Sequence, residues 1–234
     1  MSAFYVRIEL GTPVILNPVL TLDGLLARLA FDRLGDAGAA LDGLPLERHG
    51  AIHKASMLFA EGPAPQAPVS MVRLVNPGKT LTADMVRPKR GAKLPNIRIH
   101  RGEFKSLLDT YTAILPRALW AFGRGDPDAV REELRGAKAI GKKRAQGWGE
   151  VADIQVEEVE VEVDARFGLM TADGEPGRAV PWPLWREIGG RQDGVTTTMA
   201  KTGFPRWSCE PEFCAVPSRP VVSPREMRAM LVGP

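Results

Sequence analysis

The chain has 234 residues, enough for one large domain or two small ones, and its formal net charge of only +3 singles out no class of partner. Hydrophobic residues make up 44% of it and charged residues 25%, which excludes the disordered and fibrous classes. Two cysteines, Cys209 and Cys214, are too few for a disulfide framework, and no apolar run approaches the roughly 18 residues of a membrane span. Arg7 and Glu9 stand where a signal peptide would need an apolar core, so we expect a cytoplasmic protein with no membrane partner.

The first sixty residues predict a strand, a helix and a second strand. Residues 3–10 alternate between apolar and polar side chains, as a half-buried strand does. Leucines and alanines then recur at helical spacing over residues 21–34, with Thr21 as the predicted N-cap and Asp23 in the first turn, where the helix dipole favours a carboxylate. Residues 35–50 are predicted to form a loop and residues 52–60 a second strand.

A broken, cationic segment follows at residues 76–101. It contains three prolines, and residues 76–105 hold eight Lys or Arg side chains against two acids. Such a segment is too irregular for a helix or strand and too charged for a core, so we predict an insertion at the surface. Apolar and β-branched residues return over residues 104–122, where we expect a third strand or a hairpin.

The next elements are a helix, a glycine-rich loop and an acidic strand. Asp126, Pro127 and Asp128 are a typical helix start and predict a helix over residues 127–138. After the loop at 137–151, residues 150–164 hold seven acids and no base, and the apolar parity changes at Glu157 and Glu158, which predicts a bulge or a break.

This order of elements predicts the fold class. Strand, helix, strand, strand, helix, strand is the order of an α+β, ferredoxin-like (RRM-like) βαββαβ core, here with a glycine-rich loop after the second helix and a basic, thumb-like insertion. We expect this domain to span residues 1–165, with the insertion at 76–101. Residues 166–234 show no clear pattern and are expected to be an extension that packs on the domain or on a neighbouring subunit.

The glycine-rich loop fails two nucleotide-binding patterns. A P-loop needs G-x-x-x-x-G-K-[ST], but five residues separate Gly141 from Gly147, and Trp148 stands in the lysine position. Residues 147–152 match a dinucleotide-binding pattern by letter, but that pattern must open a helix, and here a β-branched, acidic strand follows.

The RNA-recognition-motif signature fits residues 146–153 only in part. Glu150 and Asp153 occupy two positions that should carry base-stacking aromatics, and in that motif the strand precedes the second helix instead of following it. We therefore do not expect the open face of the sheet to be a stacking platform for bases.

One glycine-rich loop does match in position and spacing. Residues 139–149 read A-I-G-KKRAQ-G-W-G, and residues 22–33 read LDGLLARLAFDR. Together they resemble the RAMP superfamily of CRISPR proteins, whose loop between the second helix and the fourth strand reads Gly-h-Gly, five variable residues, Gly-h-Gly. Within it they resemble the Cas-five-like subunit of type IV CRISPR effector complexes (the Csf family). Ala139 departs from the pattern, because the first glycine belongs there.

The resemblance implies a non-catalytic subunit without a cofactor or metal. It implies binding of the five-prime handle of the CRISPR RNA and capping of a filament of Cas-seven-like backbone subunits. It further implies contact with a large Cas-eight-like subunit and with target DNA near the PAM.

Two groups of residues are the expected RNA-binding sites. In the loop they are Lys138, Gly141, Lys142, Lys143, Arg144, Gln146, Gly147, Trp148 and Gly149. Glycine lets backbone N–H groups approach phosphates closely, and the cations add charge to the same turn. In the basic segment, where related subunits carry a thumb, they are Arg87, Lys89, Arg90, Lys93, Arg98 and Arg101, which would grip the sugar–phosphate backbone without reading sequence. The plainer interpretation of both groups is a solvated basic surface.

Other readings stay open. Some RAMP proteins cleave RNA without metal through a histidine after the first helix, and His49 or His53 with Tyr5 or Tyr111 could act in this way, which makes an endoribonuclease the main alternative. A generic RNA-binding module is a third reading. Because no other cysteine is present, we expect Cys209 and Cys214 to be free thiols and not half of a zinc site. We expect Trp182, Trp185 and Trp207 to pack against the domain or a subunit, and not to stack on bases.

Overall fold

The computed structural model describes residues 1–16, 20–73, 107–160, 163–204 and 209–233. The chain divides into two compact units, of which the first combines Met1–Pro65 with Ile114–Pro234 and the second is Gln66–Ala113. Helices and strands of both directions occur together, so the prediction of an α+β protein is confirmed.

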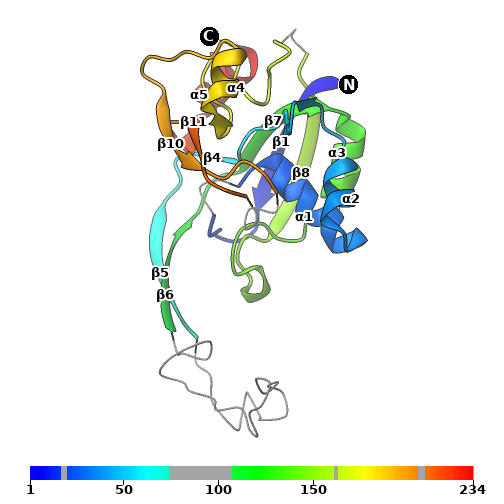
Figure 1. Ribbon diagram of the computed structural model, residues 1–234. Coiled ribbons are helices and arrows are strands. Elements are labelled where there is room, and N and C mark those ends of the chain that lie inside the picture. Colours follow the sequence, from blue (N-terminus) through cyan, green and yellow to red (C-terminus); the bar gives the residue numbers. More distant parts are fainter. Residues whose placement is uncertain (17–19, 74–106, 161–162, 205–208, 234) are drawn as a thin grey trace, which may run out of the picture. The chain divides into compact units, whose positions relative to one another are not determined.

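A five-stranded sheet forms the centre of the first unit (Figure 1). Its strands are β1 (Ser2–Leu10), β4 (Phe59–Glu61), β7 (Leu119–Gly125), β8 (Val151–Glu158) and β12 (Val221–Val222), in the spatial order β12-β4-β7-β1-β8. The pair of β12 with β4 is parallel, and the other pairs are antiparallel. The alternation seen in the first strand places Phe4, Val6 and Ile8 on one face of the sheet, where all three are fully buried.

The helices begin where their capping residues predict. α1 (Leu22–Leu34) starts at Thr21, whose hydroxyl accepts from the backbone N–H of Gly24, and α3 (Pro127–Leu134) starts at Asp126, whose carboxylate accepts from two backbone N–H groups. α3 ends at Leu134, four residues before the predicted end. The turn at Gly136 and Ala137 satisfies its last carbonyls with shorter-range bonds.

Residues 35–60 are more ordered than predicted. The expected loop at 35–50 is wrong in part, because it contains α2 (Ala37–Asp42), which Asp36 caps through a 2.7 Å bond to the N–H of Ala39. The last residues of this segment form β2 (Arg48–His49), which pairs with β3 (Ile52–His53). The strand predicted over 52–60 is therefore two short strands, β3 and β4, since Ala55 and Met57 take part only in isolated bridges.

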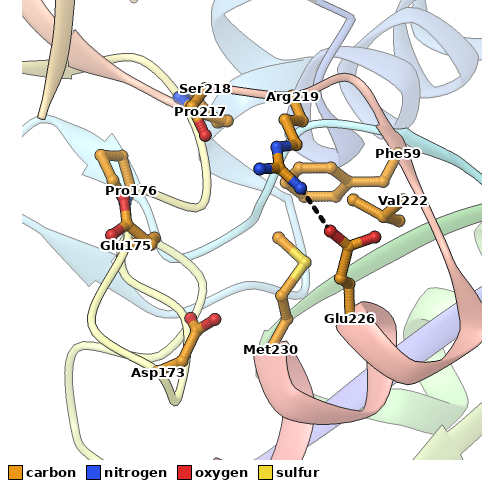
Figure 2. A pocket seen from close by; sticks show the side chains of 10 residues that line it. All are labelled: Phe59, Asp173, Glu175, Pro176, Pro217, Ser218, Arg219, Val222, Glu226 and Met230. Atoms are coloured by element: carbon orange, nitrogen blue, oxygen red, sulfur yellow. Dashed lines mark hydrogen bonds and ion pairs between the residues drawn. The ribbon is translucent and has the colours of Figure 1, made fainter.

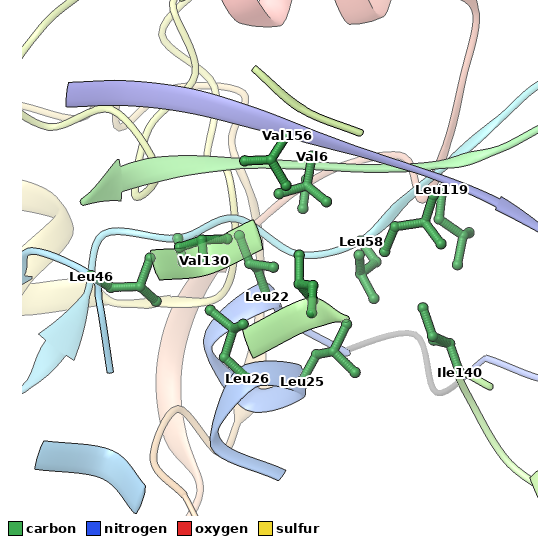
Figure 3. Close-up of a cluster of buried hydrophobic side chains, with 14 of the residues drawn as sticks. Val6, Leu22, Leu25, Leu26, Leu46, Leu58, Leu119, Val130, Ile140 and Val156 are labelled. Carbon is green, nitrogen blue, oxygen red and sulfur yellow. The ribbon is translucent and has the colours of Figure 1, made fainter. Parts of the chain in front are cut away.

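The main core lies between the sheet and the helices α1 and α3 (Figure 3). Leu22, Leu25 and Leu26 of α1 and Val130 of α3 meet the inward side chains of β1, β7 and β8 there. Ile140 of the glycine-rich loop enters the same cluster and is 1% exposed. The loop is thus anchored in the core by one apolar side chain.

The opposite face of the sheet is partly covered by the C-terminal segment. Phe59 and Phe122 stack there with ring centroids 5.9 Å apart, and Phe167 packs on Phe122. α5 (Pro224–Val232) adds Met227 and Met230 to this cluster, and Ser223 and Glu226 close its N-terminus as a capping box. This half of the face is therefore interior and not a surface.

The rest of the C-terminal segment folds around a third cluster. β9 (Val180–Pro181), β10 (Thr196–Ala200) and β11 (Glu212–Val216) form a sheet in the order β10-β11-β9, and α4 (Trp182–Glu187) packs on it. Trp185 is fully buried, and its indole N–H donates to the Arg191 carbonyl at 2.8 Å. The sequence predicted none of these elements.

The described part of the second unit is a two-stranded ribbon. β5 (Gln66–Arg73) pairs with β6 (Leu107–Ile114), and Ser70 and Thr110 are joined by a 3.2 Å hydrogen bond between their hydroxyls. The region 104–122, predicted as a third strand or a hairpin, holds two strands, of which only β7 joins the main sheet. The basic segment 76–101 lies outside the described residues.

The acidic strand is shorter than its sequence pattern. β8 ends at Glu158, which confirms the break predicted at Glu157 and Glu158. Its register with β1 also shifts between Glu9 and Leu10, near the start of β8. Val159 keeps one further bond, from its N–H to the Ala3 carbonyl at 2.9 Å, and the chain then leaves the sheet.

Candidate nucleic-acid interface

The glycine-rich loop between α3 and β8 has a closed base. The N–H of Ile140 donates to the carbonyl of Gly149 at 2.8 Å, and the N–H of Val151 donates to the carbonyl of Lys138 at 3.0 Å. Ala139 and Glu150 form an isolated antiparallel bridge between the two arms. These bonds hold the two ends of the loop side by side, so the residues between them form a turn of defined shape.

The base is also tied to the segment that follows β1. The N–H groups of Lys142 and Gly149 donate to the carbonyls of Ile15 and Pro13 at 2.8 and 2.9 Å. The N–H of Glu150 donates to the Thr12 hydroxyl at 2.9 Å. Sequence reasoning missed this contact, because no local signal marks Thr12 as a partner of a residue so far along the chain.

Two of the three glycines in the loop are required by the fold. Gly141 and Gly149 have φ of +87° and +69°, and a Cβ there would lie 2.6 Å from the Ile15 carbonyl oxygen and 2.0 Å from the Ile140 carbonyl oxygen. Gly147 differs: its φ is +83°, but a Cβ would meet nothing within 4 Å. The N–H of Gly149 donates to the Pro13 carbonyl, and the N–H of Gly147 donates to the Arg144 carbonyl at 3.1 Å. The close approach of backbone to phosphate that we expected of all three glycines therefore fits Gly147 best because of the open space around it, and not because of a free N–H.

The tip of the loop is exposed and cationic. It carries a short 3-10 helix, Arg144–Gln146, preceded by Lys143 with φ of +60°. Lys138, Lys142, Arg144 and Gln146 are exposed, whereas Lys143 and Trp148 are half-buried. The predicted loop residues thus separate into a buried base, which includes Gly149, and an exposed tip that a ligand can reach.

The other predicted RNA-binding group cannot be placed beside this loop. Arg87, Lys89, Arg90, Lys93, Arg98 and Arg101 all lie outside the described residues. The described strands on either side of them, β5 and β6, pair with each other and belong to the second unit.

Asp23, within the leucine-rich motif of α1, has a structural partner. Its carboxylate lies 2.7 Å from a guanidinium nitrogen of Arg178, whose residue is 1% exposed. Arg178 also donates to the carbonyls of His53, Ala55 and Thr202, while its Nε has no hydrogen-bond partner. Burial alone would raise the pKa of Asp23, but Arg178 and the Thr21 hydroxyl outweigh it, so this pKa is lowered. The motif therefore ties α1 to the C-terminal segment.

The two histidines that the structure describes lie in different surroundings. His53 is 4% exposed, and its Nε2 accepts from Arg48 at 2.9 Å. Burial lowers the pKa of His53 despite the nearby Asp23, so its ring is neutral. His49 has a partly exposed side chain, with Nε2 3.4 Å from a carboxylate oxygen of Glu187. Of these two, His49 is the one that a substrate could reach.

His49 lines a hollow of about 570 Å³ in the first unit. Other lining residues are Ile52, Leu184, Glu187, Cys209 and Glu212. Tyr5, the tyrosine of the first unit that we considered with the histidines, does not line this hollow. Tyr5 lies on the main sheet, where it bonds to Glu157 and where burial, with that carboxylate, raises its pKa to about 12. Tyr111 lies in the second unit. Within the first unit, the structure thus brings His49 together with Glu187, whereas Tyr5 lies elsewhere, on the main sheet.

A smaller hollow of about 230 Å³ lies beside α5 (Figure 2). Figure 2 shows Asp173 and Glu175 on one side and Arg219 on the other, with Arg219 paired to Glu226 at 2.6 Å. Carboxylates outnumber cations around it, which disfavours a phosphate group. This hollow is therefore not a second candidate for RNA binding.

The cysteines and tryptophans bear on two further expectations. Cys214 is fully buried, and burial raises the pKa of its thiol to about 11. No group of three or more His, Cys, Asp or Glu side chains within the described residues is arranged to hold a metal ion. Trp185 is a core residue, Trp182 packs on Phe213 with ring centroids 5.6 Å apart, and Trp207 lies outside the described residues.

No family model matches the chain, and no curated protein matches it significantly. In the parts of the chain that the structure describes, no helix has both the length and the apolar character needed to cross a membrane.

Proposed function

We propose that this protein is a non-catalytic RNA-binding subunit with a ferredoxin-like core, acting inside a CRISPR ribonucleoprotein in the cytoplasm. The observation that carries the proposal is the glycine-rich loop, which combines a base tied to the segment after β1 with an exposed tip of cations. A fixed turn that presents several cations can bind phosphates without losing much conformational freedom of its own backbone.

The arrangement of the main sheet supports the ferredoxin-like part of the proposal. β1, α1, β4, β7, α3 and β8 follow one another in the expected order, apart from the short elements and the ribbon inserted between them. The strand order β4-β7-β1-β8, with α1 and α3 packed into the core on one face, supports a split βαβ arrangement. β12 extends this sheet at its β4 edge.

The proposal includes the assembly that the sequence resemblance implies. The protein would hold the five-prime handle of the CRISPR RNA and cap a filament of Cas-seven-like subunits in a type IV complex, next to a Cas-eight-like subunit and the PAM. The loop tip, Lys142, Lys143 and Arg144, would contact phosphates, and Gly147 would allow close approach. The thumb role of the basic segment 76–101 is part of the same proposal.

The test has two stages. Tagged protein is first purified from its own cells, where we expect it to carry one class of small RNA within a larger complex. Binding of that RNA by the pure protein is then measured over a range of salt concentrations. Replacing Lys142, Lys143 and Arg144 by alanine should weaken binding and lower the log–log salt slope by about 0.7 for each phosphate that the variant no longer neutralises.

A matched control removes the same charge elsewhere. Arg186, Arg225 and Arg228 are exposed and lie in α4 and α5, so their triple alanine variant also loses three positive charges. It should bind RNA with nearly unchanged affinity and slope. If the two folded triple variants behave alike, the loop has no special role in RNA binding, and the proposal is wrong for this site.

A specific observation favours a second candidate, a metal-independent endoribonuclease. His49 lies at a hollow of sufficient size for a nucleotide and is paired with Glu187, so it could exchange a proton with a ribose hydroxyl. The pure protein should then cut the co-purified RNA or its precursor in the presence of a chelator. Loss of cutting in His49→Ala, with His53→Gln still active, would establish the nuclease over the binding-only reading.

A further inference from the structure

The outer edge of β8 is an unpaired sheet edge. β8 is the last strand of the main sheet, and no strand in the described part of the chain pairs with its outer side. Figure 1 shows β8 beside β1, with α3 close to it. Such an edge presents backbone donors and acceptors in the geometry that another strand would use.

The phase of the β1–β8 pairing identifies the outward groups. Val159 donates to the Ala3 carbonyl, so Glu157 and Gln155, two and four residues earlier, also direct their backbone groups toward β1. Ile154, Val156 and Glu158 then direct theirs outward. The Val156 carbonyl agrees with this assignment, because it accepts from the Arg131 guanidinium at 2.6 Å.

The charge along this edge selects the class of partner. Asp153, Glu157 and Glu158 are exposed, and the acidic stretch that contains them has no basic residue. These carboxylates repel phosphate groups, which disfavours RNA, DNA and anionic membranes here. A polypeptide with cations would instead be attracted, and opposite charges on neighbouring strands stabilise their pairing.

We propose that the outer edge of β8 binds an extended segment of a partner protein that carries Lys or Arg at alternate positions. The segment adds a strand through the backbone groups of Ile154 and Glu158 and displaces Arg131 from the Val156 carbonyl. Its cations face Asp153 and Glu157, which lie on the same side of β8. This inference does not rest on the RNA-binding function, because it uses no residue of the loop.

The test uses synthetic peptides and the full chain. A peptide of alternating lysine and valine is compared with a peptide of the same composition in which all lysines precede all valines. We expect the alternating peptide to bind more tightly and to slow amide hydrogen exchange at Ile154, Val156 and Glu158. The exchange at these three positions distinguishes strand addition from general attraction between opposite charges.

Two pairs of substitutions complete the test. D153K with E157K should weaken binding of the alternating peptide by about tenfold, because attractive cross-strand pairs become repulsive. D193K with E210K changes the net charge equally at exposed positions outside β8 and should alter the affinity by less than about twofold.

A backbone variant addresses the edge itself. Ile154→Pro removes an outward N–H that no bond to β1 uses, so a folded variant should lose the protection at Val156 and Glu158. The proposal is overturned if the two peptides bind alike or if no amide of β8 is protected. The acidic row would then serve only to keep β8 from pairing with other chains. If Ile154→Pro does not fold, the peptide comparison and the charge variants decide the question alone.

Discussion

Replacing Asp23 by alanine should destabilise the protein far more than a typical substitution in the first turn of a helix. The side chain of Asp23 is 12% exposed and that of Arg178 is 2% exposed, and the charged groups are 2.7 Å apart. The substitution leaves the guanidinium buried without a counter-ion, which costs about 3–5 kcal/mol. Since a domain is stable by only about 5–15 kcal/mol, this change removes a large share of the free energy of unfolding.

The measurement is urea unfolding followed by far-ultraviolet circular dichroism. The matched control is Asp32→Ala in the same helix, which breaks the exposed Asp32–Arg28 pair and should cost less than about 1 kcal/mol. Combining Asp23→Ala with Arg178→Met should recover part of the loss, because no unpaired charge then remains buried. If Asp23→Ala costs no more than the control, the ion pair does not hold the C-terminal segment to α1, and our account of the leucine-rich motif is wrong.

Two further predictions concern the loop and pH. Gly149→Ala should destabilise the fold by about 3 kcal/mol or more, because the new Cβ clashes with the Ile140 carbonyl and the backbone there is left-handed. Gly147→Ala should cost only about 1 kcal/mol, because it meets the left-handed backbone without a clash. Equal losses of stability in thermal unfolding would mean that the loop base relaxes freely. The pKa of His53 is lower in the folded protein than in the unfolded chain. At a pH just below the ordinary histidine pKa of about 6.5, the unfolded chain therefore binds more protons than the folded protein does. The free energy of unfolding should therefore fall as the pH drops from about 7.5 to 5.5, by at most about 1.4 kcal/mol per pH unit. In urea unfolding, His53→Gln should show a flatter pH dependence than the unchanged protein. The same pH dependence in both proteins would contradict a neutral His53 ring in the folded state.

Elements whose signals are local could be predicted from the amino-acid sequence. The alternation of residues 3–10 follows from the period of a strand, and the starts of α1 and α3 follow from Thr21 and Asp126, which act on backbone groups within a few residues. The position of the glycine-rich loop between α3 and β8 could be predicted for the same reason. The end of β8 at Glu158 was visible in the change of apolar parity.

Features that join distant segments could be seen only in the folded structure. The bond between Asp23 and Arg178 connects residues 155 positions apart, and β12 joins β4 through two residues that carry no period. The sequence showed that Gly141 and Gly149 are glycines, but the reason is the closeness of Ile15 and Ile140. A local pattern records what a residue needs from its own helix or strand. Such a pattern does not indicate which distant segment will pack against the residue, because that contact forms only when the segments pack into one core.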